Sequence, residues 1–194
     1  MSMASTKERL ILEGLNLLKE AGIENLNLRA LAARLGIKAP SIYEHFASKA
    51  DLLKTLRDEL WQRLARQMVE AMGPETKAEN RLLALGLAFG RFFEDEPGLS
   101  RLLLEELPLR AEPSTAPQTP YSLLISEINR WLTSIGGDRR SSERIAYGFW
   151  SILQGGLVMR QSLLKDLRAP FSAMDKANLR AFMAGIATQV KEGA

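Results

Sequence analysis

The chain has 194 residues, of which 46% are hydrophobic and 25% charged, and its formal net charge at pH 7 is +3. This length and composition suffice for a hydrophobic core in one or two small domains. There is no cysteine and only one histidine, which excludes a disulfide scaffold and a thiolate metal site and favours a reducing compartment.

The first two predicted helices carry clear start and stop signals. Ser5 followed by Glu8 forms a capping box, which predicts a helix that runs to Gly22. Asn27 suits the N-cap of a second helix because its side-chain oxygen can accept from the first free amides. Gly36 then ends this helix, since glycine adopts the left-handed conformation without strain.

A third helix follows after a very short connection. Pro40 fits its first turn, where a missing amide hydrogen is harmless. Ile42 and Phe46 are four residues apart and face inward, so the side chains between them point outward. Two helices joined by a turn of about four residues that contains glycine form a helix-turn-helix, and its second helix is shaped to enter the DNA major groove.

Positive charge is concentrated in this part of the chain. Residues 26–57 contain six basic and two acidic side chains, a net charge of +4, although the whole chain carries only +3. Lys38 and Lys49 lie at the starts of the third and fourth helices, where the helix dipole disfavours a cation. A phosphate held by the helix-end amides and the lysine together explains this placement.

The rest of the chain is predicted to be helical. Ser48 and Asp51 begin a fourth helix that continues to about residue 72, and Gly73-Pro74 ends it. Further helices are expected at residues 77–94, 99–107, 121–135, 141–164 and 172–190, with a proline-rich loop at 108–120. The fold class is therefore all-α, with a helix-turn-helix domain at 1–50, a connecting helix at 51–72 and a larger helical domain at 73–194.

Two features of the C-terminal domain allow a functional and a purely structural interpretation. Apolar residues of the last helix form a stripe at helical spacing: Leu179, Phe182, Met183, Ile186 and Val190. This stripe belongs either to an intrachain core or to an interface with a second copy. A set of aromatic and neighbouring residues suits either a ligand cavity or plain core: Phe89, Phe92, Phe93, Leu103, Trp131, Tyr147, Trp150 and Gln154.

At residues 5–57 the sequence resembles the DNA-binding domain of the TetR/AcrR family of bacterial transcriptional regulators. The resemblance rests on LRALAARLGI followed by SIYEHFASKADLL, especially Tyr43, His45, Phe46 and Lys49. It implies a dimer in which each subunit has a three-helix DNA-binding domain and a larger helical sensor domain. The last two helices would pair with those of the partner as a four-helix bundle.

The resemblance also implies which residues touch DNA. The matching positions are Arg29, Ala39, Pro40, Ser41, Tyr43, His45 and Lys49, to which the dipole argument adds Lys38. Ser41 is the main candidate for a hydrogen bond to a base, and the Ala39 methyl group can meet a thymine methyl.

The sequence therefore predicts a dimeric, sequence-specific transcriptional regulator, and more specifically a repressor released by a small, largely apolar ligand. Its expected partners are double-stranded DNA with a palindromic operator, a second copy through the last two helices, and an unidentified small-molecule effector.

Charges throughout residues 1–25 speak against a signal peptide, so a cytoplasmic location is expected. The longest uncharged apolar stretch, 145–159, is too short to cross a bilayer, so no membrane partner is expected.

No enzymatic activity, metal or cofactor is expected. The sequence has no nucleophile elbow, no phosphate-binding loop and no glycine-rich nucleotide fingerprint. Two alternatives stay open. One is a constitutive DNA-binding architectural protein whose C-terminal half only dimerises. The other is a helical enzyme or lipid-binding module attached to a relict DNA-binding domain.

Overall fold

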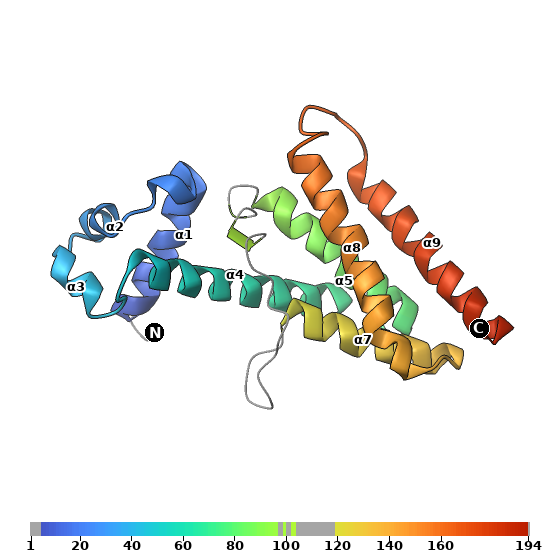
Figure 1. The fold of residues 1–194 in the computed structure, drawn as a ribbon. Coiled ribbons are helices and arrows are strands. Elements are labelled where there is room, and N and C mark those ends of the chain that lie inside the picture. Colours follow the sequence, from blue (N-terminus) through green and yellow to red (C-terminus); the bar gives the residue numbers. More distant parts are fainter. Residues whose placement is uncertain (1–4, 97–98, 100–101, 104–118, 194) are drawn as a thin grey trace. The chain divides into compact units, whose positions relative to one another are not determined.

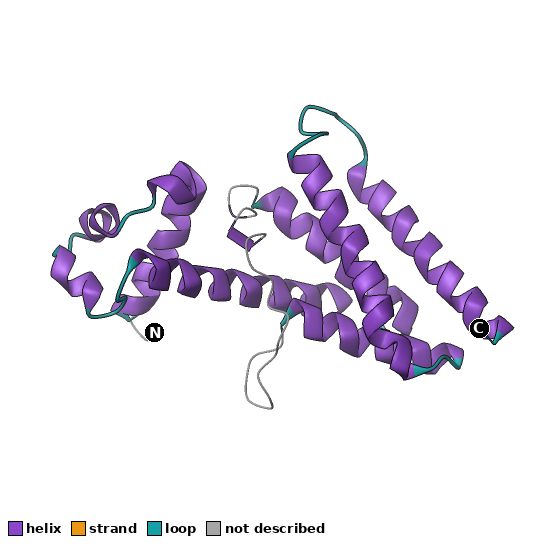
Figure 2. Ribbon diagram, in the orientation of Figure 1, coloured by secondary structure: helices purple, strands orange, loops and turns teal. Residues whose placement is uncertain are grey.

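The computed structural model describes residues 5–96, 99, 102–103 and 119–193, and these residues contain helices and no strand (Figure 2). The elements in chain order are α1 (Thr6–Asn25), α2 (Leu28–Leu35), α3 (Ala39–Tyr43), α4 (Lys49–Met72), α5 (Ala78–Asp95), α7 (Pro120–Ile135), the short 3-10 helix η2 (Arg139–Ser141), α8 (Ser142–Gln161) and α9 (Phe171–Glu192). The prediction of an all-α fold is confirmed. The helix predicted at 99–107 and the loop predicted at 108–120 lie mostly outside the described residues.

The helices belong to two compact units, and the division falls within the long helix α4 (Figure 1). The N-terminal unit comprises residues 1–61 and 96–107, and the C-terminal unit comprises residues 62–95 and 108–194. The first unit therefore holds α1, α2, α3 and the start of α4. The second holds the end of α4 together with α5, α7, η2, α8 and α9. In the described ranges, each helix is too short or too polar to cross a membrane.

Helix α1 begins as the sequence predicts and ends differently. The Ser5 hydroxyl accepts from the Glu8 amide at 3.2 Å, and the Glu8 carboxylate accepts from the Ser5 amide at 2.6 Å. Gly22 was expected to end the helix, but its φ of 75° and ψ of 171° produce a kink, after which the helix continues to Asn25. The prediction of a break is right and the predicted end is wrong, because the chain returns to helical geometry after one residue.

The core of the N-terminal unit is built from one face of each of its helices. Its fully buried large side chains include Leu10, Leu15, Leu18, Leu31, Ile42, Phe46, Leu52 and Leu56. Gly14 of α1 permits close packing against α4, because a Cβ atom there would lie 3.1 Å from the terminal carbons of Leu56. Burial of Ile42 and Phe46 fixes which side of α3 is left for other partners.

The turn between α2 and α3 depends on Gly36. This residue adopts φ 65° and ψ 27°, and its amide donates to the carbonyl groups of Ala32 and Ala33. The Ile37 amide donates to the Ala32 carbonyl at 3.1 Å, so the last turn of α2 is closed by two successive amides. The chain can then reverse direction within three residues and start α3.

Replacing Gly36 by valine should lower the free energy of unfolding by about 2 kcal/mol, since a β-branched residue is strained in left-handed geometry. A Cβ atom at this position would have no neighbour within 4 Å, so the cost is one of backbone conformation and not of packing. Gly36→Asn should cost less than about 1 kcal/mol, because asparagine tolerates this conformation. Urea unfolding followed by circular dichroism measures the free energy of unfolding of both variants. Equal decreases for valine and asparagine would contradict a cost that comes from backbone conformation.

Helix α5 is the centre of the C-terminal unit. It packs against α7, α8 and α9. A Cβ atom on Gly86 would lie 2.7 Å from Leu179 of α9 and 3.1 Å from the ring of Phe149 of α8. Glycine is therefore required where these three helices approach one another. An ion pair joins α5 to α7 as well, with the Arg81 guanidinium and the Glu127 carboxylate in bidentate contact at 2.7 and 2.9 Å.

The apolar stripe of α9 lies mainly in the core of its own chain. Leu179, Met183 and Ile186 are buried and Phe182 and Val190 are half-buried, so most of the stripe packs within its own chain. The opposite face of α9 carries small exposed side chains, including Ala177, Ala181, Ala184, Gly185 and Thr188. The corresponding face of α8 carries Tyr147, Ser151, Gly155 and Val158. A stripe at helical spacing predicts a face that is packed, but the sequence does not indicate whether that face packs against its own chain or against a second copy.

Candidate nucleic-acid interface

Helix α3 presents one side to the core and the other to solvent. Of the residues predicted to contact DNA, Lys38 and Pro40 are exposed, and Tyr43 has an exposed fraction of 57%. Ser41 and His45 are half-buried. The structure describes Ala39 as the first residue of α3 but does not describe its side chain. The outward positions of this helix therefore coincide with the predicted contact residues.

Helices α2, α3 and α4 of the N-terminal unit border a hollow of 670 Å³ that is open to solvent. It is lined by residues from the start of α2, the end of α3 and the start of α4: Asn27, Leu28, Arg29, Tyr43, Ala47, Ser48 and Lys49. Three of the predicted contact residues, Arg29, Tyr43 and Lys49, therefore meet in one place, although Lys49 lies 20 residues after Arg29 in the sequence.

The hollow lies at the N-termini of two helices. Asn27 caps α2, accepting from the Ala30 amide at 2.7 Å. Before α4, the Ser48 hydroxyl accepts from the Asp51 amide at 3.1 Å, and the Asp51 carboxylate accepts from the Ala47 amide at 3.0 Å. These caps satisfy only some of the amides at the two helix ends, and both dipoles favour an anion. The hollow combines these two ends with a guanidinium, an ammonium and a phenol, which are groups that bind phosphate.

Lys49 is already held in the free protein. Its ammonium group donates to the carbonyl oxygen of Ile23 at 3.2 Å, and the side chain is half-buried. Ile23 follows Gly22, whose φ of 75° and ψ of 171° kink α1. Lys49 therefore stabilises the last turn of α1 and lines the hollow at the same time, a double role that the sequence did not reveal.

Part of the positive charge of residues 26–57 has a structural role. Arg34 pairs with two acids of α1, with distances of 2.9 Å to Glu13 and 2.8 Å to Glu20. The hydrogen bond from Arg34 lowers the pKa of Glu20, and the same bond raises the pKa of Arg34. Arg57 donates to the Leu102 carbonyl at 3.1 Å. The predicted excess of cations for DNA is therefore smaller than the count of basic residues indicates.

The residues predicted to line a ligand cavity do not all lie together. Phe89, Phe92, Phe93 and Trp150 are buried in one aromatic cluster, in which Phe89 and Trp150 lie 5.2 Å apart between ring centroids. Trp131 is buried in α7, whereas Tyr147 is 72% exposed, which excludes it from a buried lining. Leu103 belongs to the N-terminal unit and cannot be assigned to this cluster.

Two polar groups border the aromatic cluster. The Trp150 indole donates to the Gln154 side-chain oxygen at 3.0 Å, as expected for a polar residue beside a buried ring. The Tyr121 ring, which the sequence pattern did not single out, lies 5.6 Å from the Trp150 ring. Burial, with a smaller contribution from Glu143, raises the pKa of Tyr121. The aromatic character of Tyr121, together with the candidate Trp131 in the same helix, was the only sequence signal for this position.

The N-terminal unit matches a known family at the level of sequence. Residues 10–56 match the model of the bacterial regulatory proteins, tetR family. The chain is 25% identical to an uncharacterized HTH-type transcriptional regulator of Mycobacterium tuberculosis, over 83% of this chain and 72% of that protein. It is 42% identical to the tetracycline repressor protein class C of Escherichia coli over 52 residues, which is 27% of this chain and 24% of that repressor.

Solved structures resemble nearly the whole chain. A protein of unknown function from Rhodococcus sp. RHA1 aligns with a TM-score of 0.79 at 21% identity, covering 94% of this chain and 96% of that one. A TetR variant from Acinetobacter baumannii AYE in complex with minocycline aligns with a TM-score of 0.69 at 22% identity, covering 96% and 99%. At these identities the likeness establishes the fold, including the helical C-terminal domain.

Proposed function

Because the chain is a DNA-binding transcriptional regulator of the TetR family, we propose that it acts as a homodimer on a palindromic operator and represses transcription until a small ligand releases it. A regulator of transcription acts where the chromosome lies, so the proposal includes a cytoplasmic location. It assigns no catalytic step to any residue.

The hollow at the N-termini of α2 and α4 carries the DNA-binding part of the proposal. Arg29, Tyr43 and Lys49 line it, and two helix dipoles add to their attraction for a phosphate. Phosphate contacts of this kind orient a helix-turn-helix so that its second helix enters the major groove. Lys38, Pro40 and Ser41 of the α3 segment would then face the base edges and the adjoining backbone.

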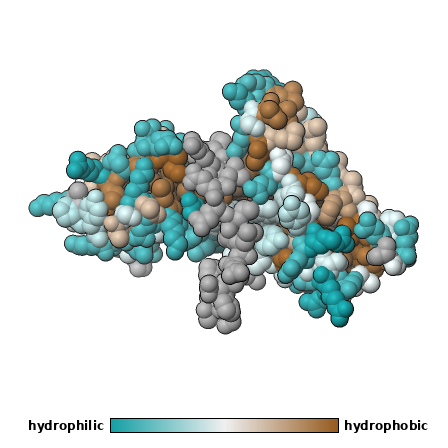
Figure 3. Space-filling model, in the orientation of Figure 1, coloured by the Kyte–Doolittle hydropathy of each residue, from teal (hydrophilic) through white to brown (hydrophobic). Residues whose placement is uncertain are grey.

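A second copy of the chain is the partner that the exposed side of α8 and α9 suits. Gly155 of α8 and Gly185 of α9 both face open space, where an added Cβ atom would have no neighbour within 4 Å. Small residues on a helix face permit another helix to approach closely. Apolar surface is exposed at the connection between α8 and α9, where Leu163 and Leu167 have exposed fractions of 81% and 54% (Figure 3). Contiguous exposed apolar surface is typical of protein–protein contacts.

The effector is proposed to bind near the aromatic cluster around Trp150. Phe89 and Tyr121 pack against this ring, Phe93 packs against Phe89, and Gln154 provides a polar group beside Trp150. Such a lining favours an uncharged or amphipathic molecule with apolar surface. The ligand would release DNA by favouring a conformer with wrongly spaced recognition helices. Near-complete release requires a difference in ligand affinity of about 5.5 kcal/mol between the two conformers.

Selection of bound fragments from a random pool of duplex DNA tests the proposal. The purified full-length protein should enrich a palindromic consensus whose half-sites lie about one helical turn apart or a multiple of it. That consensus then serves as the probe in a screen for small molecules that lower operator affinity. Binding without any consensus would favour the architectural alternative, and absence of binding at low salt would favour a module with a relict DNA-binding domain.

Ser41→Ala should alter sequence preference more than total affinity. The hydroxyl group is half-exposed on the outer side of α3, so its removal deletes one donor and acceptor at the base edges. We expect a loss of about 1 kcal/mol for the preferred base at one position of each half-site and little change elsewhere. Repeating the selection with the variant measures this. An identical consensus from both proteins would exclude Ser41 as a base-contacting residue.

A further inference from the structure

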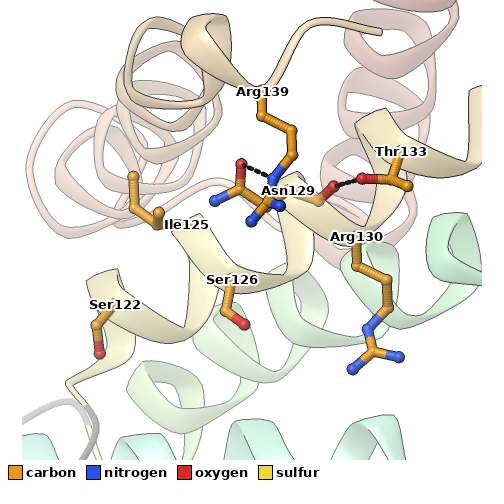
Figure 4. Close-up of a pocket in the computed structure, with 7 residues that line it drawn as sticks. All are labelled: Ser122, Ile125, Ser126, Asn129, Arg130, Thr133 and Arg139. Carbon is orange, nitrogen blue, oxygen red and sulfur yellow. Dashed lines mark hydrogen bonds between the residues drawn. The ribbon is translucent and has the colours of Figure 1, made fainter. Parts of the chain in front are cut away.

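The outer side of α7 carries a hollow that the proposed function does not use. It has a volume of 520 Å³ and is lined by Arg139 of η2 and by residues of α7: Ser122, Ile125, Ser126, Asn129, Arg130 and Thr133 (Figure 4). We call this surface the α7 face. The α7 residues recur every three or four positions over residues 122–133, so the face extends along about 16 Å of the helix.

The α7 face carries two guanidinium groups, each with hydrogen-bond donors that have no strong acceptor among the described residues. Arg130 lies 3.5 Å from Glu127, but that carboxylate is already held in bidentate contact by Arg81. Arg139 makes one long hydrogen bond, of 3.4 Å, from Nε to the Asn129 side-chain oxygen. Among the described residues, no acidic side chain lines the hollow. Both guanidinium groups are therefore available to an anionic partner.

The arrangement of these groups suits a partner whose negative charges are spaced apart. Figure 4 shows Arg130 directed away from Arg139, so one small anion could not contact both guanidinium groups. The Asn129 amide lies beside the Arg139 guanidinium and the Ser126 hydroxyl lies one turn earlier on α7, and both side chains can bond peptide groups. Ile125 supplies a half-buried apolar contact in the same hollow, for which a phosphate backbone has no counterpart.

We propose that the α7 face binds an extended acidic segment of another protein. Two of its carboxylates would form bidentate pairs with Arg130 and Arg139, and a neighbouring apolar side chain would rest on Ile125, which lies on the side of Arg139 away from Arg130. At about 3.3 Å per residue, some five residues of an extended peptide span the face. The α7 face contains none of the residues assigned to DNA contact and none of those on the exposed side of α8 and α9.

Selection from phage-displayed random dodecapeptides tests this proposal with the full-length protein. We expect enrichment of peptides in which two Asp or Glu residues lie to one side of an apolar residue, and binding that weakens as salt is raised. Arg130→Gln combined with Arg139→Gln should weaken a labelled enriched peptide by at least about tenfold in fluorescence anisotropy. Arg91→Gln with Lys191→Gln removes the same charge from exposed positions outside the face and should leave binding unchanged.

Two kinds of result would overturn the proposal. Failure to enrich acidic peptides, or equal losses in both double variants, would show that the α7 face is not a peptide site. A loss of affinity for unrelated duplex DNA in the Arg130 and Arg139 variant alone would identify a nucleic-acid surface instead. Unchanged circular dichroism and melting temperature confirm that the variants are folded, and unchanged operator affinity separates this surface from the DNA-binding one.

Discussion

Replacing Arg81 by methionine should lower the free energy of unfolding by about 3 kcal/mol. The substitution leaves the Glu127 carboxylate, only 5% exposed, without its bidentate partner, and a buried charge that loses its partner is strongly destabilising. Arg130 cannot replace Arg81, because its contact with Glu127 is 3.5 Å long and its side chain is 61% exposed. Urea unfolding followed by tryptophan fluorescence, at one protein concentration, measures the loss.

Replacing the other member of the ion pair shows whether the loss of stability comes from leaving a charge buried or only from losing the contact. Glu127→Leu should cost less than Arg81→Met, because the long Arg81 side chain is 17% exposed and can turn its guanidinium toward solvent. The double variant should return to within about 1 kcal/mol of the natural protein, since an apolar pair of similar volume fills the same space. Equal losses in both single variants, with additive loss in the double variant, would contradict this explanation.

Lys49→Ala should weaken binding to duplex DNA of any sequence by about 100-fold at low salt. A dimer loses two lysine–phosphate contacts, each a charge-assisted hydrogen bond worth about 1.5 kcal/mol. The slope of log K against log salt should flatten by about two units, because two fewer counterions are released. Fluorescence anisotropy over a series of salt concentrations provides both quantities.

Lys54→Ala is the matched control for Lys49→Ala. It removes the same charge from the same helix, and a displacement of five residues places Lys54 about 140° around α4 from Lys49. Lys54 does not line the hollow, so its replacement should change the affinity by less than about threefold and the slope only slightly. A loss as large as that of Lys49→Ala would indicate that general positive charge, and not the hollow, binds DNA.

The helix-turn-helix could be predicted closely because its signals are local. Asn27 and Gly36 bound α2, and Ser48 caps α4, each through hydrogen bonds to residues at most four positions away. Gly22 was harder to interpret because a positive φ can either end a helix or kink it. Directly after the kink, the Ile23 carbonyl accepts from Lys49, 26 residues later, and the local sequence does not reveal this contact.

Long-range partners could not be predicted from the sequence. Arg29 and Arg34 contribute equally to the net charge of residues 26–57. In the structure, however, Arg34 is paired with Glu20, 14 residues earlier, whereas Arg29 lines the hollow. Likewise, Tyr147 and Trp150 are both aromatic residues of α8, but they lie on different faces, one exposed and one buried. Sequence periodicity assigns residues to a face but does not identify the neighbour that covers it.

The bond from Lys49 to the Ile23 carbonyl bears on the entropy of DNA association. Ordering a free lysine side chain costs up to about 2 kcal/mol, and here part of that ordering precedes any contact with a phosphate. An ammonium group has three hydrogens, so one can stay with Ile23 while two remain for a phosphate. Changes near the kink at Gly22 would therefore release this lysine and weaken DNA binding from residues that never touch DNA.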